Sequence, residues 1–344
     1  MAVSLKDISL KTHINICSVS QVLNNHPKAL RLREETREKI LIAAKELGYC
    51  RNEAAASIRR KKSNVLALVT SEMGSIEYTG RIQNGVLDAA SNLGYTITIH
   101  RLARNTAREI AENLLGWRVA GVIFHVATLA SIKEITEILD RESIPWGTVN
   151  LSNPGGIGFT SNDKEGVIEA VRFLAEEGHK RIAYFANSDK IVNEYQINRM
   201  EGYKKGLQKY LPGFSGKSYF LNDPALLAQS EAAAEFLDAI LRDEMDAVIC
   251  ESDLLALFLM RGGQLKNISI PEKLSLIGFG DGLLAENASP PLTTVHQDFV
   301  EMGEATVKEL VERVSCKKMA SEKECATFPV KLIKRSSTCI QNKK

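Results

Sequence analysis

Small hydroxyl and amide side chains recur at helical spacing near the start of the chain, in the stretch ICSVSQVLN. Gln and Asn can form paired hydrogen bonds with base edges in the DNA major groove, where apolar groups also contact thymine methyls. If the stretch is a helix, Val19, Val22 and Leu23 form an inward stripe. The side chains left pointing outward are those of Ile16, Cys17, Ser18, Ser20, Gln21 and Asn24. This face therefore has the residue types needed to contact DNA bases and phosphates.

Two helix start signals position this face. Ser4 offers a hydroxyl to the free amides of a first helix, and Asp7 has the offset of a capping box. Asn15 offers its side-chain amide oxygen to the free amides of a second helix, and Ile14 and Val19 have the spacing of a hydrophobic staple. The pattern predicts two short helices joined by a tight turn, the geometry of a helix-turn-helix. The ordinary alternative is a small three-helix domain whose polar residues are only solvated.

A third helix is predicted from about residue 33 to residue 47, with Gly48 as its end. The side chains expected on its inner face are those of Ile40, Leu41, Ala44 and Leu47. Between the second and third helices, the sequence NHPKALRLR predicts a Pro-containing loop with three basic residues. Basic side chains beside a groove-reading helix suit phosphate contact.

The pattern D-I-x(6)-I-N-x-x-S-V-S-x-V-L-N resembles the LacI/GalR family of bacterial transcription regulators, and the resemblance continues to the end of the chain. It implies base-reading roles for Ile16, Cys17 and Gln21. It also implies that the remaining DNA contacts of this region come from Lys6, Ser18, Ser20 and Asn24. The chain departs from the family at His13, where Gly is usual, and at Gln21, where Arg is usual. His tolerates a left-handed turn, and Gln21 implies a different preferred base.

Residues 51–63, RNEAAASIRRKKS, are alanine-rich but too short to form a stable helix alone in water. The resemblance implies a hinge helix that pairs with its dimer mate and enters the minor groove. The family's contact positions fall on Asn52, Ala55, Ile58 and Arg59, with Ile58 as the apolar side chain that wedges between base pairs. The alternative is a flexible linker.

Charge is distributed unevenly along the 344 residues. Residues 1–63 contain 13 basic and 6 acidic residues, whereas the remainder contains 31 basic and 36 acidic ones. A basic segment on an acidic body indicates a nucleic-acid contact confined to one end. The six cysteines show no metal-binding spacing, and no signal peptide or long apolar run is present. These features predict a cytoplasmic protein with reduced thiols and no membrane contact.

From residue 64 onward, predicted strands and helices alternate, which favours α/β halves with parallel sheets covered on both faces. The segments EEGHKRIAYF, PEKLSLIGFGD and PPLTTVHQD resemble the family's periplasmic-binding-protein-like effector domain. The predicted organisation is a helix-turn-helix headpiece in residues 1–50, a hinge in residues 51–63, and an effector and dimerisation domain in residues 64–340 of two doubly wound halves. The boundaries expected for these halves are 64–159 with 295–325, and 160–294 with 326–340.

Ligands of open parallel sheets bind beyond the carboxyl ends of the strands. The effector-binding residues predicted on this rule and on the resemblance are Tyr78, Asn150, Arg199, Ser252, Asp253, Asp281 and Gln297. Arg199 is expected to open its helix, and it matches a family arginine that forks two hydrogen bonds to an effector. The sequence GGIG at residues 155–158 lacks the strand-then-helix context of a dinucleotide site and predicts a turn.

The expected function is a ligand-responsive, sequence-specific DNA-binding regulator, most simply a repressor of carbohydrate-related genes released by an inducer. The expected partners are a near-palindromic operator, a small-molecule effector such as a sugar or its derivative, and a second copy of the chain. A dimer is expected to be the largest assembly because no heptad repeats follow residue 340. No catalytic constellation, metal site or cofactor is predicted. The alternatives are a sugar-binding protein without a DNA role, a regulator that needs a co-repressor, and an enzyme; the operator and effector stay open.

Overall fold

The computed structural model describes residues 3–24, 26–49, 63–71, 77–102, 106–190, 193–316 and 325–341. The chain divides into two compact units, Met1–Ser63 and Asn64–Lys344, and each is described by itself. The first unit is called the headpiece. The second contains two lobes, each built around its own sheet.

The described part of the headpiece consists of short helices around one core. These are α1 (Leu5–Thr12), α2 (Ile16–Leu23), the 3-10 helix η1 (Pro27–Arg31) and α3 (Glu34–Glu46). The predicted capping box is confirmed, because the Ser4 hydroxyl accepts from the Asp7 amide and the Ser4 amide donates to Asp7 Oδ2 at 2.8 Å. His13 ends α1 in the left-handed region at φ 58°, so the turn forms without glycine.

Apolar side chains from α1, α2 and α3 form the headpiece core, with Ile8, Val19 and Ile40 fully buried. The prediction that Leu41 also lies on the inner face is wrong, since that side chain is 52% exposed. An amphipathic helix buries only one stripe, and Ala43 and Ala44 occupy it beside Ile40. The segment predicted as a plain loop contains η1, which contributes the buried Ala29 to the same core.

The first lobe of the second unit is assembled from two separate parts of the chain. Its elements are β1 (Val65–Thr70), α5 (Glu77–Asn92), β2 (Thr96–Arg101), α6 (Ala107–Gly116), β3 (Gly121–His125), η2 (Leu129–Ile132), α7 (Lys133–Arg141), β4 (Trp146–Val149), β5 (Ile157–Ser161), α13 (Phe299–Cys316) and β11 (Cys325–Phe328).

The second lobe is likewise discontinuous in sequence. Its elements are α8 (Asp163–Glu176), β6 (Ile182–Ala186), α9 (Glu194–Tyr210), β7 (Lys217–Phe220), η3 (Pro224–Ala228), α10 (Ser230–Arg242), β8 (Ala247–Cys250), α11 (Asp253–Lys266), β9 (Ser275–Gly280), α12 (Leu283–Glu286), β10 (Thr293–His296) and β12 (Lys331–Ile333).

Both sheets have the doubly wound order expected from alternating strands and helices. The first sheet runs β11-β5-β4-β3-β1-β2 and is parallel throughout. The second runs β12-β10-β9-β8-β6-β7 and is parallel except for the pairing of β10 with β12. The predicted α/β class with two parallel-sheet halves is confirmed.

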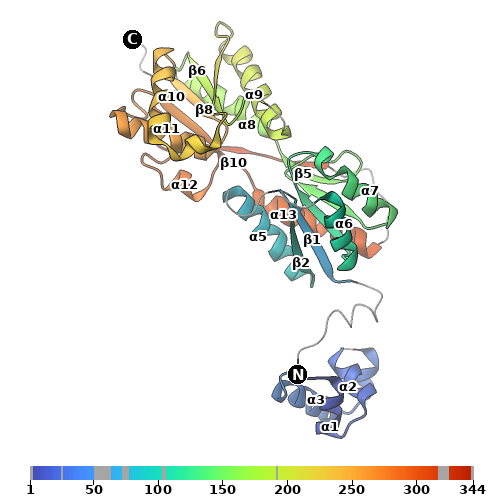
Figure 1. Ribbon diagram of the computed structural model, residues 1–344. Helices are drawn as coiled ribbons and strands as arrows, with labels where there is room; N and C mark the ends of the chain where they lie inside the picture. Colours follow the sequence, from blue (N-terminus) through green and yellow to red (C-terminus); the bar gives the residue numbers. More distant parts are fainter. Residues whose placement is uncertain are drawn as a thin grey trace. The chain divides into compact units, whose positions relative to one another are not determined.

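Helices cover both faces of each sheet, as Figure 1 shows for α5 and α13 on one side of the first sheet and α6 and α7 on the other. Successive side chains along a strand therefore pack into the cores on opposite faces of the sheet. Leu66 and Leu68 of β1 pack with α5 and α13, whereas Ala67 and Val69 pack with α6 and α7. This alternation follows from the two-residue repeat of a strand.

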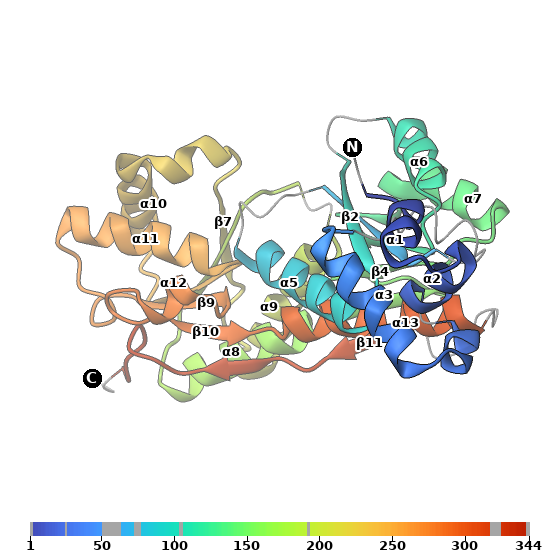
Figure 2. The same cartoon turned by 90° about the horizontal axis from the view of Figure 1, so that it is seen from below.

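The chain passes between the lobes three times, after β5, after β10 and after β11; Figure 2 shows the last two crossings in red. The expected boundaries are therefore shifted by a few residues. Because β5 extends to Ser161 and β11 to Phe328, both strands belong wholly to the first lobe, and β10 belongs to the second. Residues 155–158 are also only partly a turn, since Ile157 and Gly158 begin β5.

Candidate nucleic-acid interface and effector cleft

The start of α2 presents an exposed surface. The Asn15 side chain accepts from the Cys17 amide at 2.8 Å, which fixes the first turn of the helix. Ile16 is 43% exposed, and Cys17 is exposed as well, while Val19 and Val22 face the core. The predicted base-reading positions at the start of α2 are therefore accessible to a large partner.

The remaining polar residues of α2 are less open than predicted. Ser18, Ser20, Gln21 and Asn24 are half-buried rather than fully outward. Asn24 Nδ2 donates to the Ser20 carbonyl at 2.6 Å and to the Ser20 hydroxyl at 3.1 Å. The side chains of Ser20 and Asn24, both predicted as DNA contacts, are therefore hydrogen-bonded to each other. Lys6 on α1 is exposed.

A basic turn is attached to the end of α2. The His26 amide donates to the Gln21 carbonyl at 2.9 Å, and His26 Nδ1 accepts from the Lys28 amide at 3.1 Å. These bonds begin η1, which leaves Lys28 and Arg31 exposed. The predicted hinge contacts Asn52, Ala55, Ile58 and Arg59 lie outside the described residues.

In the second unit, a small pocket lies at the carboxyl ends of the first lobe's strands, as the strand-end rule predicts. Its volume is about 50 Å³. It is lined by Ser71, Tyr78, His125, Val126, Ala127, Asn150, Leu151, Asn193, Glu194 and Tyr195. Tyr78 and Asn150 were both predicted, and Asn150 adopts a left-handed conformation at φ 57°. Because it is the predicted site of the effector, we call this pocket the effector cleft.

His125 lies buried beside the ring of Tyr78, with the two ring centroids 6.0 Å apart in an edge-to-face arrangement. Burial lowers the pKa of His125 from 6.5 to about 4, because the charged imidazolium would lose its hydration. At neutral pH the imidazole is therefore uncharged, so this wall of the effector cleft offers a neutral polar group.

Arg199 is buried within a polar network instead of opening a helix. It is the sixth residue of α9, which begins at Glu194, so the expected helix start is wrong. Its Nε donates to Asp163 Oδ2 at 2.8 Å, its Nη2 donates to Gln297 Oε1 at 3.2 Å, and its Nη1 donates to the Glu251 carbonyl. The guanidinium also stacks 3.7 Å from the ring centroid of Phe279.

The partners of Arg199 are connected to one another. Gln297 Nε2 donates to Ser161 Oγ at 2.6 Å and to Asp163 Oδ1 at 3.0 Å. Burial raises the pKa of Asp163, and the charge of Arg199 opposes that rise. Arg199 and Gln297, both predicted as ligand contacts, thus stabilise the joint between α8, α9 and the second crossing.

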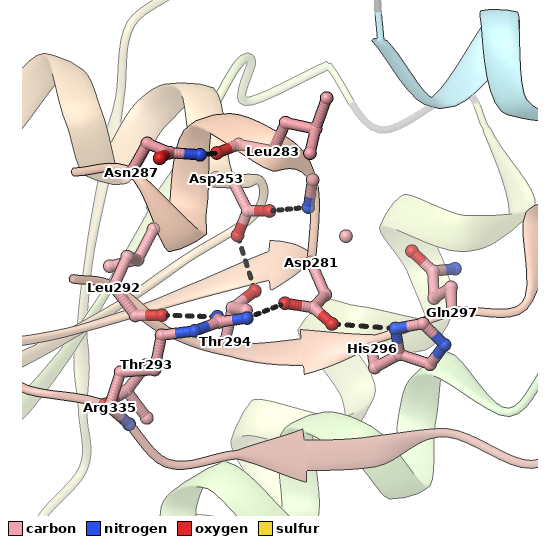
Figure 3. A network of polar contacts seen from close by, with 12 residues as sticks. Asp253, Asp281, Leu283, Asn287, Leu292, Thr293, Thr294, His296, Gln297 and Arg335 are labelled. Atoms are coloured by element: carbon pink, nitrogen blue, oxygen red, sulfur yellow. Dashed lines mark hydrogen bonds and ion pairs between the residues drawn. The ribbon is translucent and has the colours of Figure 1, made fainter.

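The other predicted effector residues also have partners in the second lobe (Figure 3). Asp253 accepts from the Gly282 amide at 3.1 Å and from the Thr294 hydroxyl at 2.5 Å, and burial raises its pKa. Asp281 accepts from Arg335 Nη2 at 2.6 Å and lies 2.8 Å from His296 Nδ1.

Ser252 caps α11 by accepting from the Leu255 amide at 3.4 Å. In this structure, Ser252, Asp253 and Asp281 are absent from the residues lining the effector cleft.

Comparison with known proteins agrees with this two-part construction. Residues 171–338 match the family model of a periplasmic binding protein-like domain. The chain is 27% identical to the HTH-type transcriptional regulator DegA of Bacillus subtilis, over 98% of each chain. It is 28% identical to the HTH-type transcriptional repressor PurR of Vibrio atlanticus, over 97% of this chain and 98% of that one.

Over nearly its whole length the chain is therefore similar to transcriptional regulators of the helix-turn-helix type, in agreement with its resemblance to the LacI/GalR family.

Solved structures support the same fold. The lac repressor dimer bound to operator and an anti-inducer superimposes with a TM-score of 0.82 at 22% identity, covering 98% of this chain and 100% of that one. A complex of the regulator CelR with cellobiose gives a TM-score of 0.66 at 23% identity, covering 97% and 99%. The fold of this chain is thus shared with these structures over nearly its whole length.

Within the described ranges, no group of three or more His, Cys, Asp or Glu side chains could hold a metal ion. No helix in those ranges is long and apolar enough to cross a membrane.

Some cleft residues escaped sequence reasoning. Asn193, Glu194 and Tyr195 line the effector cleft from the second lobe, at the start of α9. Their signal was available, because Asn193 and Gln196 have the spacing of a capping box, which the structure contains. The predicted helix began at Arg199, five residues after the observed start at Glu194, so these three residues were not predicted to line the cleft.

Proposed function

We propose that this regulator acts as a homodimeric repressor of carbohydrate-related genes, and that a small-molecule inducer bound in the effector cleft releases it from its operator. One observation supports this above all: a single chain joins a helix-turn-helix headpiece to a two-lobed unit that contains a cleft. Several relatives are named repressors. Because its proposed binding partner is chromosomal DNA, the protein would work in the cytoplasm.

The proposed DNA target is near-palindromic. One headpiece covers too little DNA for tight specific binding, so two must bind half-sites related by two-fold symmetry. Selection from a pool of randomised duplexes, using the full chain, should return an inverted repeat. Recovery of a strictly asymmetric single site would reject the dimeric mode of binding.

The proposed effector is a neutral, hydroxyl-rich molecule such as a sugar. Among the described residues, those lining the effector cleft include two tyrosines, two asparagines, the neutral His125 and the carboxyl group of Glu194, and no Lys or Arg. Anionic ligands are usually held by Arg or Lys, whereas aromatic rings and amides suit uncharged polar ligands. Titrating pooled sugars and sugar phosphates against an operator complex tests this class.

The direction of control is part of the same titration. If an effector lowers operator affinity by roughly 5- to 150-fold, the coupling is of ordinary allosteric size and the protein is inducible. A compound that strengthens the complex would instead indicate a co-repressor, since the same linkage works in either direction.

The proposed dimer surface includes apolar side chains that the second unit leaves open. Leu283 and Leu284 of α12 are 71% and 58% exposed, Leu254 of α11 is 47% exposed, and Leu87 of α5 is 40% exposed. Exposed apolar side chains that gather into a patch mark interaction sites. Sedimentation at micromolar concentration should show a dimer; only monomer, or a stable tetramer, would contradict this assembly.

A binding protein without a DNA role is the rival function. Deleting residues 1–63 separates the two, because the second unit has its own cores. The deletion should abolish operator binding and leave effector binding intact. If the full chain shows no sequence-specific DNA binding under any effector condition, the rival function is favoured.

A further inference from the structure

The 3-10 helix η1 is held firmly against the end of α2. Pro27 lies in its first turn, and the His26 ring accepts from the Lys28 amide at 3.1 Å. The His26 amide donates to the Gln21 carbonyl of α2 at 2.9 Å. Ala29 is only 7% exposed and packs with the buried side chains of α2 in the headpiece core. The position of η1 relative to α2 is therefore fixed by both backbone and core contacts.

The three-residue repeat of a 3-10 helix gives η1 three distinct sides. One side carries Ala29 and faces the core. A second side carries Lys28 and Arg31, and a third carries Pro27 and Leu30; all four of these residues are exposed. Leu30 is 75% exposed, more than any other large apolar side chain in the described part of the chain. The outer surface of η1 thus consists of a basic ridge beside an apolar one.

The segment that forms α2 and η1 contains no acidic residue. No Asp or Glu occurs between Asp7 and Glu34, a stretch that includes both elements. A single exposed leucine is common on protein surfaces. Here, however, the leucine is flanked by two exposed cations, Lys28 and Arg31, which suits a polyanion that also offers apolar groups. DNA has both, because phosphates border its major groove and thymine methyl groups lie within it.

The length of α2 determines how far η1 lies from the base-reading positions predicted at the start of that helix. From Ile16 to Leu23, α2 has 8 residues, which correspond to about 12 Å along the helix axis. Successive base pairs are about 3.4 Å apart. With α2 along the major groove, η1 therefore reaches DNA about three to four base pairs away from the contacts of Ile16 and Cys17.

We propose that η1 is a second DNA-contacting element of the headpiece, which places Leu30 against a thymine methyl group and Lys28 and Arg31 against the neighbouring phosphates. The proposal rests on the proposed function in taking α2 as the groove-reading helix. It goes further because it adds a base contact outside α2 and lengthens each half-site. Since η1 is already ordered without DNA, little of the contact energy is lost to ordering this segment on binding.

Selection from randomised duplexes with the full chain tests the base contact. The parent should select thymine about three to four base pairs from the positions assigned to the start of α2. Leu30→Ala should lose this preference and keep the rest of the site, and its affinity for the parent's site should fall roughly ten-fold. Replacing the selected thymine by uracil, which lacks the methyl group, should weaken binding of the parent and leave that of Leu30→Ala unchanged.

The salt dependence of binding to the selected duplex tests the phosphate contacts. The logarithm of the association constant falls linearly with the logarithm of the salt concentration, with a slope of about −0.9 for each phosphate contact. Lys28→Gln and Arg31→Gln should each make this slope shallower by about 0.9 per headpiece, and should weaken all sequences equally. The replaced side chains are exposed, so the variants should keep the parent's circular dichroism spectrum.

The matched controls are Leu41→Ala and Lys45→Gln, which remove an exposed leucine and an exposed lysine from α3. Both should keep the parent's site, affinity and salt dependence. The inference is overturned if Leu30→Ala selects the same flank with the parent's affinity, which is also the result expected if Leu30 docks a protein. A parent that selects no site overturns the proposed function together with this inference. A parent that selects a site that the η1 variants bind equally well overturns this inference alone.

Discussion

Removing Arg199 should destabilise the second lobe, because the change leaves a buried carboxylate without its counter-charge. The side chains of Arg199 and Asp163 are only 8% and 2% exposed, and Arg199 Nε lies 2.8 Å from Asp163 Oδ2. Breaking a buried ion pair by removing one partner costs about 3–5 kcal/mol. We expect Arg199→Ala to lower the free energy of unfolding by an amount in this range at pH 7.

The loss should also depend on pH in a definite direction. Burial raises the pKa of Asp163 and Arg199 opposes this, so removing the guanidinium raises that pKa further. A carboxyl whose folded-state pKa lies above its unfolded value binds its proton more tightly when folded. Its contribution to stability is present at low pH and is lost as the pH rises through the folded pKa. The deficit of Arg199→Ala should therefore be larger at pH 8 than at pH 5.

Urea unfolding of the full chain, followed by circular dichroism at pH 5 and pH 8, measures both effects. The matched comparison is Asp163→Asn combined with Arg199→Met, which removes both charges and keeps an acceptor for Gln297. This double variant should be more stable than Arg199→Ala alone. A loss below about 1 kcal/mol for Arg199→Ala, or a double variant that is less stable than the single one, would refute the buried-pair argument.

Three further predictions concern the effector cleft, the headpiece and the dimer. Unfolded His125 takes up a proton near pH 6.5, whereas folded His125 does so only near pH 4. The free energy of unfolding should therefore fall by about 3 kcal/mol as the pH is lowered from 6.5 to 4, and His125→Gln should remove this part of the pH dependence measured by urea unfolding. Replacing Gln21 should change the preferred base in randomised-site selection, while parent affinity should drop steeply with salt; an unchanged site or a flat salt response would argue against the DNA contacts. Leu283→Asp should shift sedimentation toward monomer, whereas Leu265→Asp, at a residue 52% exposed on α11, should not.

Local signals in the sequence were enough to predict the helix-turn-helix of the headpiece and the parallel α/β class of the second unit. The capping residues Ser4 and Asn15 and the left-handed His13 act over three or four residues, so their spacing alone positions α1 and α2. The alternation of strands and helices likewise predicts parallel sheets with the cleft beyond their carboxyl ends. Tyr78 and Asn150 were found on this rule.

Contacts between residues far apart in the sequence could not be predicted from local spacing. Arg199 pairs with Asp163, 36 residues away, and Asp281 pairs with Arg335, 54 residues away. A polar residue at a strand end can face the cleft or a neighbouring strand end, and sequence spacing does not distinguish the two. The pairing of Asp281 with Arg335, from beyond β12, could therefore not be predicted from the sequence.

The three crossings between the lobes have a consequence for synthesis on the ribosome. The core beneath the first sheet needs Phe299, Met302 and Leu310 of α13 to cover Leu66 and Leu68. At about 5–20 residues per second, α13 begins to emerge roughly 7 to 30 s after β5. During that interval one apolar face of the nascent first lobe has no covering helix, while α8 to α11 of the second lobe are being made. Chaperone binding to the growing chain should therefore concentrate on the earlier lobe, although it is the first to leave the exit tunnel.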